Sequence, residues 1–319
     1  MFRTSRLVRY INQNRRKIIL VVGIIAGVII VIQLLNAFTK KQLMNTSKIE
    51  NLEVGTQNVY QPNKTILTNT TVGENQAKEN NNIIEEFVQY CNNAETQKAY
   101  DLLTDECKEI LYPTVDKFNN YYCKKIFTDK MQYNIQSWIN DGDNYTYKIR
   151  FLQDILATGK YNSEAIEDYI TIIEDNNQLK ININSYIMRQ KINRKQTSQD
   201  ITVNIISKDI YKEYEEYEIK VTNNRDETIL LDSLETVDGI ELIGDSNDVK
   251  YQALTNELSN YDVKIPSKNT KTIKIKFRRE YNPRRETSKI YFSNVILNED
   301  KYEENKDDKS NKTTIEIQL

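Results

Sequence analysis

The stretch Asn144-Tyr-Thr-Tyr-Lys-Ile-Arg-Phe151 alternates apolar and polar side chains. Its apolar members occupy every second position: Tyr145, Tyr147, Ile149 and Phe151. This period of two is typical of a strand that buries one face. Upstream, Met131, Tyr133 and Ile135 alternate in the same way, and the residues between the two runs include Asp141-Gly-Asp-Asn144, a turn sequence. The two runs therefore predict an antiparallel hairpin.

Working outward from this hairpin, the pattern predicts strands on one side and helices on the other. The run 166–173 and the alternating run 179–183 predict two more strands. Before the hairpin, 82–91 and 94–103 carry apolar residues at helical spacing, and Thr104 and Thr114 precede two further helical segments as N-cap residues. Helices followed by antiparallel strands predict an α+β domain at 81–189, with its helices on a curved antiparallel sheet.

The helical part also carries a family resemblance. The run Phe87-Val-Gln-Tyr-Cys-Asn-Asn-Ala-Glu-Thr-Gln-Lys-Ala-Tyr-Asp-Leu-Leu-Thr-Asp-Glu-Cys-Lys108, followed by Tyr112-Pro-Thr-Val-Asp-Lys-Phe118, resembles the opening of nuclear transport factor two-like domains of bacterial extracytoplasmic proteins. The cone-shaped sheet of that fold often encloses a pocket. The resemblance implies that a pocket here would be lined by Trp138, Tyr145, Tyr147 and Tyr169. The alternative is that these four aromatic residues belong to the core.

Beyond a basic, polar connector at 190–198, the chain is rich in short alternating runs. Examples are 201–205, 217–221, 273–277, 290–292 and 315–317. Strands at this spacing predict an all-β, immunoglobulin-like sandwich at 199–319. The run Pro266-Ser-Lys-Asn-Thr-Lys-Thr-Ile-Lys-Ile-Lys-Phe277 is similar to sequences of many bacterial surface sandwiches.

The N-terminal segment is apolar over a length that suits a bilayer. No polar side chain occurs from Ile18 to Ile32, which predicts a transmembrane helix at 18–38, behind a basic arm at 1–17 and before a polar linker at 39–80. The arm holds six basic and no acidic residues, which predicts a cytoplasmic N-terminus and an extracytoplasmic bulk of a single-pass cell-membrane protein. A cleaved signal peptide is the alternative. Gly23 and Gly27 have the spacing of a helix-dimer face and suggest a homodimer, unless they are incidental small residues.

Composition excludes several classes of function. The chain has no histidine, which excludes catalysis by Ser-His-Asp or Cys-His and zinc sites that need histidine. Beyond the basic arm, 38 basic residues remain from the 44, against 46 acidic ones, so that a nucleic-acid partner is not expected. No catalytic, cofactor-binding or metal-binding motif is present, and we expect no enzyme. Of the three cysteines, Cys91 and Cys107 are the candidate disulfide, and three reduced, buried thiols are the alternative.

The functional expectation follows from this layout. We expect a membrane-anchored, extracytoplasmic binding or scaffold protein of a bacterial cell envelope, which contacts lipid through its anchor. The layout resembles that of bitopic components of secretion and conjugation machines, and so implies an envelope protein partner. One basic cluster is the candidate partner patch: Arg278, Arg279, Arg284 and Arg285. A small-molecule or lyase-like pocket in the first domain is the alternative function.

Overall fold

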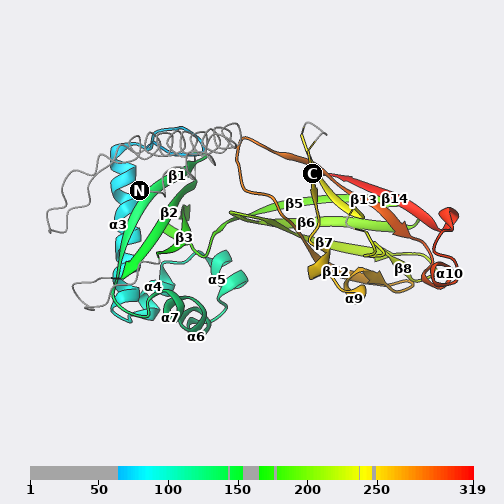
Figure 1. The fold of residues 1–319 in the computed structure, drawn as a ribbon, viewed down its shortest axis with the longest axis horizontal. Coiled ribbons are helices and arrows are strands. Elements are labelled where there is room, and N and C mark those ends of the chain that lie inside the picture. Colours follow the sequence, from blue (N-terminus) through cyan, green and yellow to red (C-terminus); the bar gives the residue numbers. More distant parts are fainter. Residues whose placement is uncertain (1–63, 143, 154–164, 176–177, 237, 246–248) are drawn as a thin grey trace, which may run out of the picture. The chain divides into compact units, whose positions relative to one another are not determined.

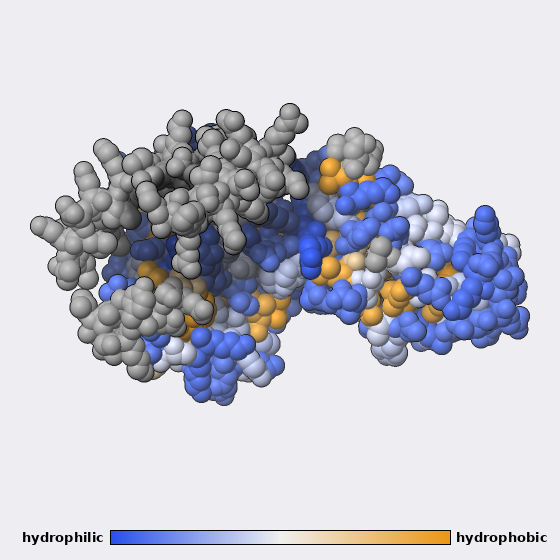
Figure 2. Space-filling view, in the orientation of Figure 1, coloured by the Kyte–Doolittle hydropathy of each residue, from blue (hydrophilic) through white to orange (hydrophobic). Residues whose placement is uncertain are grey.

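Antiparallel strands make up most of the structure. The computed structural model describes residues 64–142, 144–153, 165–175, 178–236, 238–245 and 249–319, all of them in one compact unit, Gln61–Leu319. Its strands form three sheets, in the orders β1-β2-β3-β4, β12-β7-β6-β5 and β10-β9-β13-β8-β11, and β14 pairs with β13 (Figure 1). Figure 2 shows that the displayed face is mainly hydrophilic, with hydrophobic residues in small separate patches.

The strands have the following bounds: β1 Met131–Asn140, β2 Asn144–Gln153, β3 Ile166–Asp175, β4 Gln178–Asn182, β5 Tyr186–Ser198, β6 Ile201–Tyr211, β7 Glu215–Asn223, β8 Ile229–Leu230, β9 Ile240–Gly244, β10 Lys250–Gln252, β11 Lys264–Ile265, β12 Thr270–Phe277, β13 Thr287–Ile296 and β14 Lys312–Gln318. The helices are α3 Glu74–Asn92, α4 Thr96–Asp101, α5 Asp105–Leu111, α6 Val115–Phe118, the π-helix η1 Asn119–Cys123, α7 Lys124–Ile126, the 3₁₀ turn η2 Thr255–Glu257, α9 Asn260–Val263, α10 Glu299–Glu304 and the 3₁₀ turn η3 Lys309–Asn311.

One face of the first sheet packs against the helices. In β2 the alternate residues Tyr147, Ile149 and Phe151 are almost completely buried, and Tyr147 is registered opposite Ile170 of β3. They share a core with apolar residues of α3, α5 and η1, including Phe87. A β-bulge between Ser137 and Ile139 interrupts the pairing of β1 with β2. The hydrophobic period of this hairpin therefore decides which face the helices cover.

The other two sheets share a second core. Their inward positions come from β6, β7 and β12 on one sheet and from β9, β13 and β14 on the other. In β6, Ile201, Val203 and Ile205 are completely buried, as the alternation predicts. Tyr217 and Phe277 lie edge to face in the same core, with 5.6 Å between their ring centroids.

The predicted fold class was wrong. We expected a transmembrane helix, an α+β domain and an immunoglobulin-like sandwich. The described residues are instead mainly antiparallel β-sheet. None of the helices described is long and apolar enough to cross a bilayer. After α3 the helices are short, because turns such as the one at Pro113 interrupt them.

Several boundaries also differ from expectation. The stretch 190–198, expected as a connector, lies within β5, where it pairs with β6. Its polar side chains suit an edge strand that is exposed to solvent. Helix α3 begins at Glu74, inside the expected linker at 39–80. The predicted span at 18–38, with Gly23 and Gly27, and the basic arm lie outside the described residues.

Candidate functional site

A cavity of about 430 Å³ lies beside the π-helix, and we call it the Tyr112 pocket. Its apolar and aromatic wall consists of Leu111, Tyr112, Tyr121, Tyr122, Ile126 and Ile166. Its polar wall consists of Lys125, Glu167, Asp168, Asn184 and Ser185. These residues come from the end of α5, from η1 and α7, from the start of β3 and from the turn between β4 and β5.

Local sequence places Tyr112 in the wall. Thr104 caps α5 by accepting a hydrogen bond from the backbone N–H of Cys107, and the helix ends at Leu111 because Pro113 disfavours helical geometry at the residue before it. Tyr112 therefore leaves the helix, with φ −138° and ψ 70°. The ring of Tyr112 packs edge to face against Tyr122, with centroids 6.0 Å apart, so the side chain is 97% buried.

The π-helix sets the positions of two further tyrosines. Within η1, Tyr121 is 60% exposed and Tyr122 is 1% exposed. A π-turn adds one residue to a helical turn and shifts which side chains face inward. Tyr121 is thereby left at the open side of the pocket and Tyr122 at its inner wall.

Asp168 is the buried acid of this pocket, and both of its oxygens already accept hydrogen bonds. Oδ2 accepts from the Tyr122 hydroxyl at 2.7 Å and from the Asn184 N–H at 3.0 Å. Oδ1 accepts from the N–H groups of Tyr169, at 2.7 Å, and Ser185, at 2.9 Å. Burial raises the pKa of Asp168, and these four donors oppose the shift. The carboxylate is committed to holding the turn between β4 and β5.

The neighbouring acid, Glu167, also has partners within the protein. Its carboxylate lies 2.8 Å from Lys148 and 3.2 Å from Arg150. The hydrogen bond from Lys148 lowers the pKa of Glu167. Neither acid of the pocket is therefore an open acceptor.

Two donors in the pocket lack partners. The hydroxyl of Tyr112 makes no side-chain hydrogen bond to any residue that the structure describes, and burial raises its pKa, so it stays protonated. Lys125 makes no ion pair within the described part of the chain, and its ammonium lies 5.7 Å from the centre of the Tyr121 ring. Both carboxylates of the pocket are thus paired within the protein, whereas Tyr112 and Lys125 can still donate.

A second cavity, of about 520 Å³, is bordered by a buried charge cluster. Glu215 is completely buried; it pairs with Arg279 and accepts the Tyr217 hydroxyl at 2.9 Å. Lys208 lies 3.9 Å from the same carboxylate, and burial lowers the pKa of this lysine. The guanidinium of Arg279 also donates to the Arg285 carbonyl. These groups largely pair with one another, which is typical of a structural cluster.

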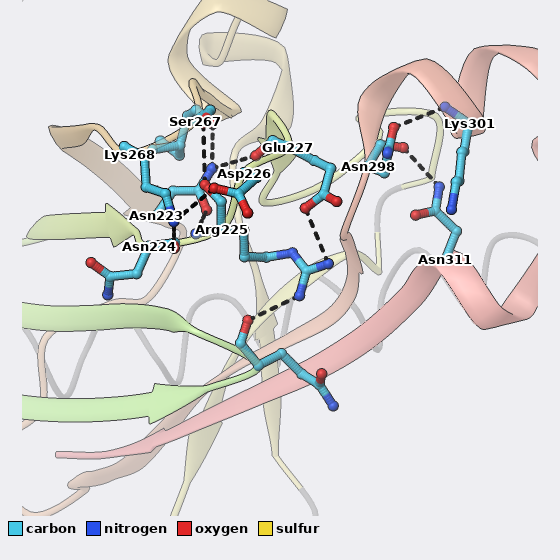
Figure 3. A network of polar contacts seen from close by, with 12 residues as sticks. Asn223, Asn224, Arg225, Asp226, Glu227, Ser267, Lys268, Asn298, Lys301 and Asn311 are labelled. Carbon is cyan, nitrogen blue, oxygen red and sulfur yellow. Dashed lines mark hydrogen bonds and ion pairs between the residues drawn. The ribbon is translucent and has the colours of Figure 1, made fainter.

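A polar network joins the loops after β7 and before β12 (Figure 3). The buried Asn223 donates to the carbonyls of Glu227, at 2.8 Å, and of Ile265 and Pro266, each at 3.1 Å. Its Oδ1 accepts from the Arg225 N–H at 3.0 Å. Every partner is a backbone group, either of the loop after β7 or of the end of β11 and the residue that follows it, so the network fixes the conformation of these loops.

A second set of contacts in Figure 3 involves charged side chains. The ammonium of Lys268 lies 2.7 Å from the Asn224 carbonyl and 2.9 Å from the Asp226 carboxylate. The guanidinium of Arg225 lies 3.4 Å from Glu227. These groups are mostly exposed to solvent, so each pair contributes little to stability.

No family model, curated protein or solved structure matches this chain. The resemblance to nuclear transport factor two-like and immunoglobulin-like domains therefore stays a prediction. The same holds for the secretion or conjugation assembly that the layout suggested.

The structure separates the four aromatic residues predicted to share a pocket. Tyr145 and Tyr147 pack in the core beneath the helices, where the Tyr147 hydroxyl accepts from Asn80 at 2.9 Å. Trp138 and Tyr169 pack against each other in a different cluster, with centroids 4.6 Å apart. None of the four lines either cavity described above. The bulge beside Trp138 explains part of the separation, because it changes the face on which that side chain lies.

The four arginines of the predicted partner patch also have different environments. Arg279 is 4% exposed and pairs with Glu215. Arg278, Arg284 and Arg285 are exposed, and Arg284 donates to the Thr68 carbonyl. The cluster in sequence is thus a patch of three arginines at most.

The cysteines are unbonded and buried. The Sγ atom of Cys91 lies 3.9 Å from that of Cys123, whereas the sequence favoured pairing with Cys107. Among the residues described, no group of three acidic or cysteine side chains could hold a metal ion.

Sequence reasoning missed the Tyr112 pocket, although two signals were present. Tyr112-Pro113 marks a residue forced out of a helix. Asn184-Ser185 follows an alternating run, and both residues adopt left-handed φ values of 58° and 61°, which asparagine tolerates in tight turns. Neither signal indicates that the two segments meet.

Proposed function

We propose that this protein is a non-catalytic binding protein, and that its Tyr112 pocket holds a small carboxylate with an apolar or aromatic body. The observation that carries the proposal is the hydroxyl of Tyr112: this residue lines the cavity and is 3% exposed, and its hydroxyl makes no hydrogen bond to a described residue. A hydroxyl that borders a cavity and has no partner in the protein can donate to a ligand acceptor there.

The size and lining of the pocket support a small organic ligand. Its volume of about 430 Å³ lies in the range of about 300–1,000 Å³ that is usual for ligand sites. Leu111, Ile126 and Ile166 offer apolar contact, and the exposed ring of Tyr121 offers a surface for stacking.

The charge of the ligand follows from which groups are already paired. Asp168 and Glu167 have their hydrogen bonds and ion pairs within the protein. Tyr112 and Lys125 can still donate. A carboxylate would accept from both, whereas a cationic ligand would meet the Lys125 ammonium without an unpaired carboxylate to compensate it.

Neither acid among the described residues of the pocket is available as a base, which supports binding rather than acid–base catalysis. Asp168, the buried acid of the pocket, accepts four hydrogen bonds. A general base must reach a substrate proton with a free lone pair in suitable geometry. The scaffold role expected from the sequence stays a prediction beside this proposal.

Ligand-observed NMR on the purified full chain tests the proposal, with three probes of one ring and different charge: benzoate, benzamide and benzylamine. We expect saturation transfer to benzoate and little to benzylamine. In Tyr112→Phe, the benzoate Kd should rise about 10–100-fold, since a hydrogen bond to a charged group contributes about 1.5–3 kcal/mol.

Tyr133→Phe is the matched control, because Tyr133 is a partly buried tyrosine outside the pocket. It should leave the benzoate Kd unchanged. Equal binding of all three probes, or equal effects of Tyr112→Phe and Tyr133→Phe, would overturn the proposal.

A further inference from the structure

Two of the three cysteines face each other between α3 and the π-helix. Cys91 lies in the last turn of α3 and Cys123 is the last residue of η1. Their Sγ atoms are 3.9 Å apart, and each residue is 6% exposed. Cys107 lies in α5 and is completely buried.

We propose that Cys91 and Cys123 form an intramolecular disulfide when the protein folds in an oxidising medium. A disulfide needs an S–S distance of about 2.05 Å, so the sulfurs must approach by roughly 2 Å. Cys91 lies in the last turn of α3, whereas Cys123 lies where η1 continues directly into α7, so side-chain rotation and a small shift of the end of α3 must supply that movement.

The reaction balances with a small-molecule disulfide as oxidant. One protein thiolate attacks oxidised glutathione to give a mixed disulfide and one molecule of reduced glutathione. The second protein thiolate then attacks the protein sulfur of this mixed disulfide and releases the second molecule of reduced glutathione. The two protein thiols lose two protons and two electrons in total, and the oxidant becomes two thiols.

Timing follows from burial. Burial raises the pKa of the Cys91 thiol, with a further contribution from Cys123. Only the thiolate attacks a disulfide, so the folded protein reacts slowly. The bond therefore forms during folding, when both sulfurs are accessible and α3 and η1 come together.

A disulfide at Cys123 would also affect the Tyr112 pocket. Cys123 directly follows Tyr121 and Tyr122 in η1. A bond to α3 would tie this π-helix to the longest helix of the described chain and restrict the two tyrosines. This inference does not depend on the proposed ligand, because it rests on the sulfur geometry alone.

The test is refolding of the full chain from denaturant in a glutathione redox buffer, followed by alkylation of free thiols and non-reducing peptide mapping. Before alkylation, we expect the oxidised protein to be lighter than the reduced protein by two hydrogen atoms. Peptide mapping should show one peptide pair joined through Cys91 and Cys123, and alkylation at Cys107 alone. The oxidised protein should melt about 5–10 °C above the reduced protein, because the bond restricts the unfolded chain.

Two variants serve as controls. Cys107→Ala should keep the bond and the shift in Tm, and Cys123→Ala should lose both. A bond between Cys91 and Cys107, or three alkylated cysteines after oxidative refolding of the unmodified sequence, would overturn the inference. Since both results come from the unmodified sequence, they do not depend on whether a variant folds.

Discussion

The hydroxyl of Tyr122 donates to Oδ2 of Asp168 at 2.7 Å, and thereby joins the π-helix to the first residues of β3. The same carboxylate holds the backbone N–H groups of Asn184 and Ser185. One acid thus connects a helix, a strand and a turn that are separated in sequence. The wall of the Tyr112 pocket depends on this connection.

We expect Asp168→Ala to lower the free energy of unfolding by about 3–4 kcal/mol, because it leaves four donors without their buried acceptor. The neighbouring Glu167→Ala should lower the free energy of unfolding by less than about 1 kcal/mol, since it removes two partly exposed ion pairs, with Lys148 and Arg150. Urea denaturation of both variants measures the difference. Equal losses would show that Asp168 does not have the role described.

The Asn223 network gives a second prediction. Asn223→Ala should lower the free energy of unfolding by about 2–3 kcal/mol, because three backbone carbonyls lose a shared donor. Asn224→Ala is the control, since the Asn224 side chain makes no hydrogen bond within the described residues; its cost should stay below about 0.5 kcal/mol. Urea denaturation of the two variants measures both losses of stability. A loss in Asn224→Ala as large as that in Asn223→Ala would contradict the prediction.

Gly239 has no room for a methyl group. A Cβ atom there would overlap the carboxylate of Asp232, which is completely buried. Gly239→Ala should therefore lower the free energy of unfolding by about 2–3 kcal/mol. Gly73→Ala, where a Cβ would meet nothing within 4 Å, should cost about 1 kcal/mol or less.

The cause of the Gly239 effect can be isolated in a double-mutant cycle. If overlap with Asp232 is responsible, Asp232→Ser should recover much of the stability lost in Gly239→Ala. Additive losses in thermal or urea unfolding would place the cause elsewhere.

Cys107 predicts a dependence of stability on alkaline pH. Burial raises the pKa of this thiol from 9.0 to about 12. An acid whose pKa is higher in the folded state stabilises the fold below the unfolded pKa, and this contribution is lost as pH rises through the folded value. The loss should therefore fall between pH 9 and 12 and amount to about 4 kcal/mol at most.

The comparison with Cys107→Ala isolates this term from other groups that titrate in the same range. Urea denaturation at pH 8, 10 and 11.5 should show a steeper fall in stability for the unmodified protein. Parallel pH profiles would mean that the Cys107 thiol has no raised pKa.

Local sequence was sufficient for many individual elements. Alternating runs predicted strands at positions where β1, β2, β6 and β7 occur, because a half-buried strand imposes a period of two. The run 166–173, which does not alternate, was also predicted as a strand and lies in β3. Thr104 and Thr114 were predicted as N-cap residues, and both accept the expected backbone hydrogen bonds. Such short-range signals failed at 190–198, where a polar edge strand looks like a connector.

The fold class and the candidate site depend on contacts between distant segments. Four aromatic residues were predicted to line one pocket: Trp138, Tyr145, Tyr147 and Tyr169. Their rings lie in different clusters, because a bulge and the pleat of the sheet place them on different faces. Arg279, which follows the end of β12, is buried beside Glu215 of β7 and pairs with it.

The sequence by itself determined the period of the strands, the caps of the helices and, through the lack of histidine, the chemistry that is excluded. Only the tertiary structure decided that Tyr112 keeps an open donor, that Asp168 is satisfied and that Cys91 faces Cys123. The reason is physical. Secondary structure follows from neighbours a few positions apart, whereas burial and hydrogen-bond pairing follow from packing across the whole unit.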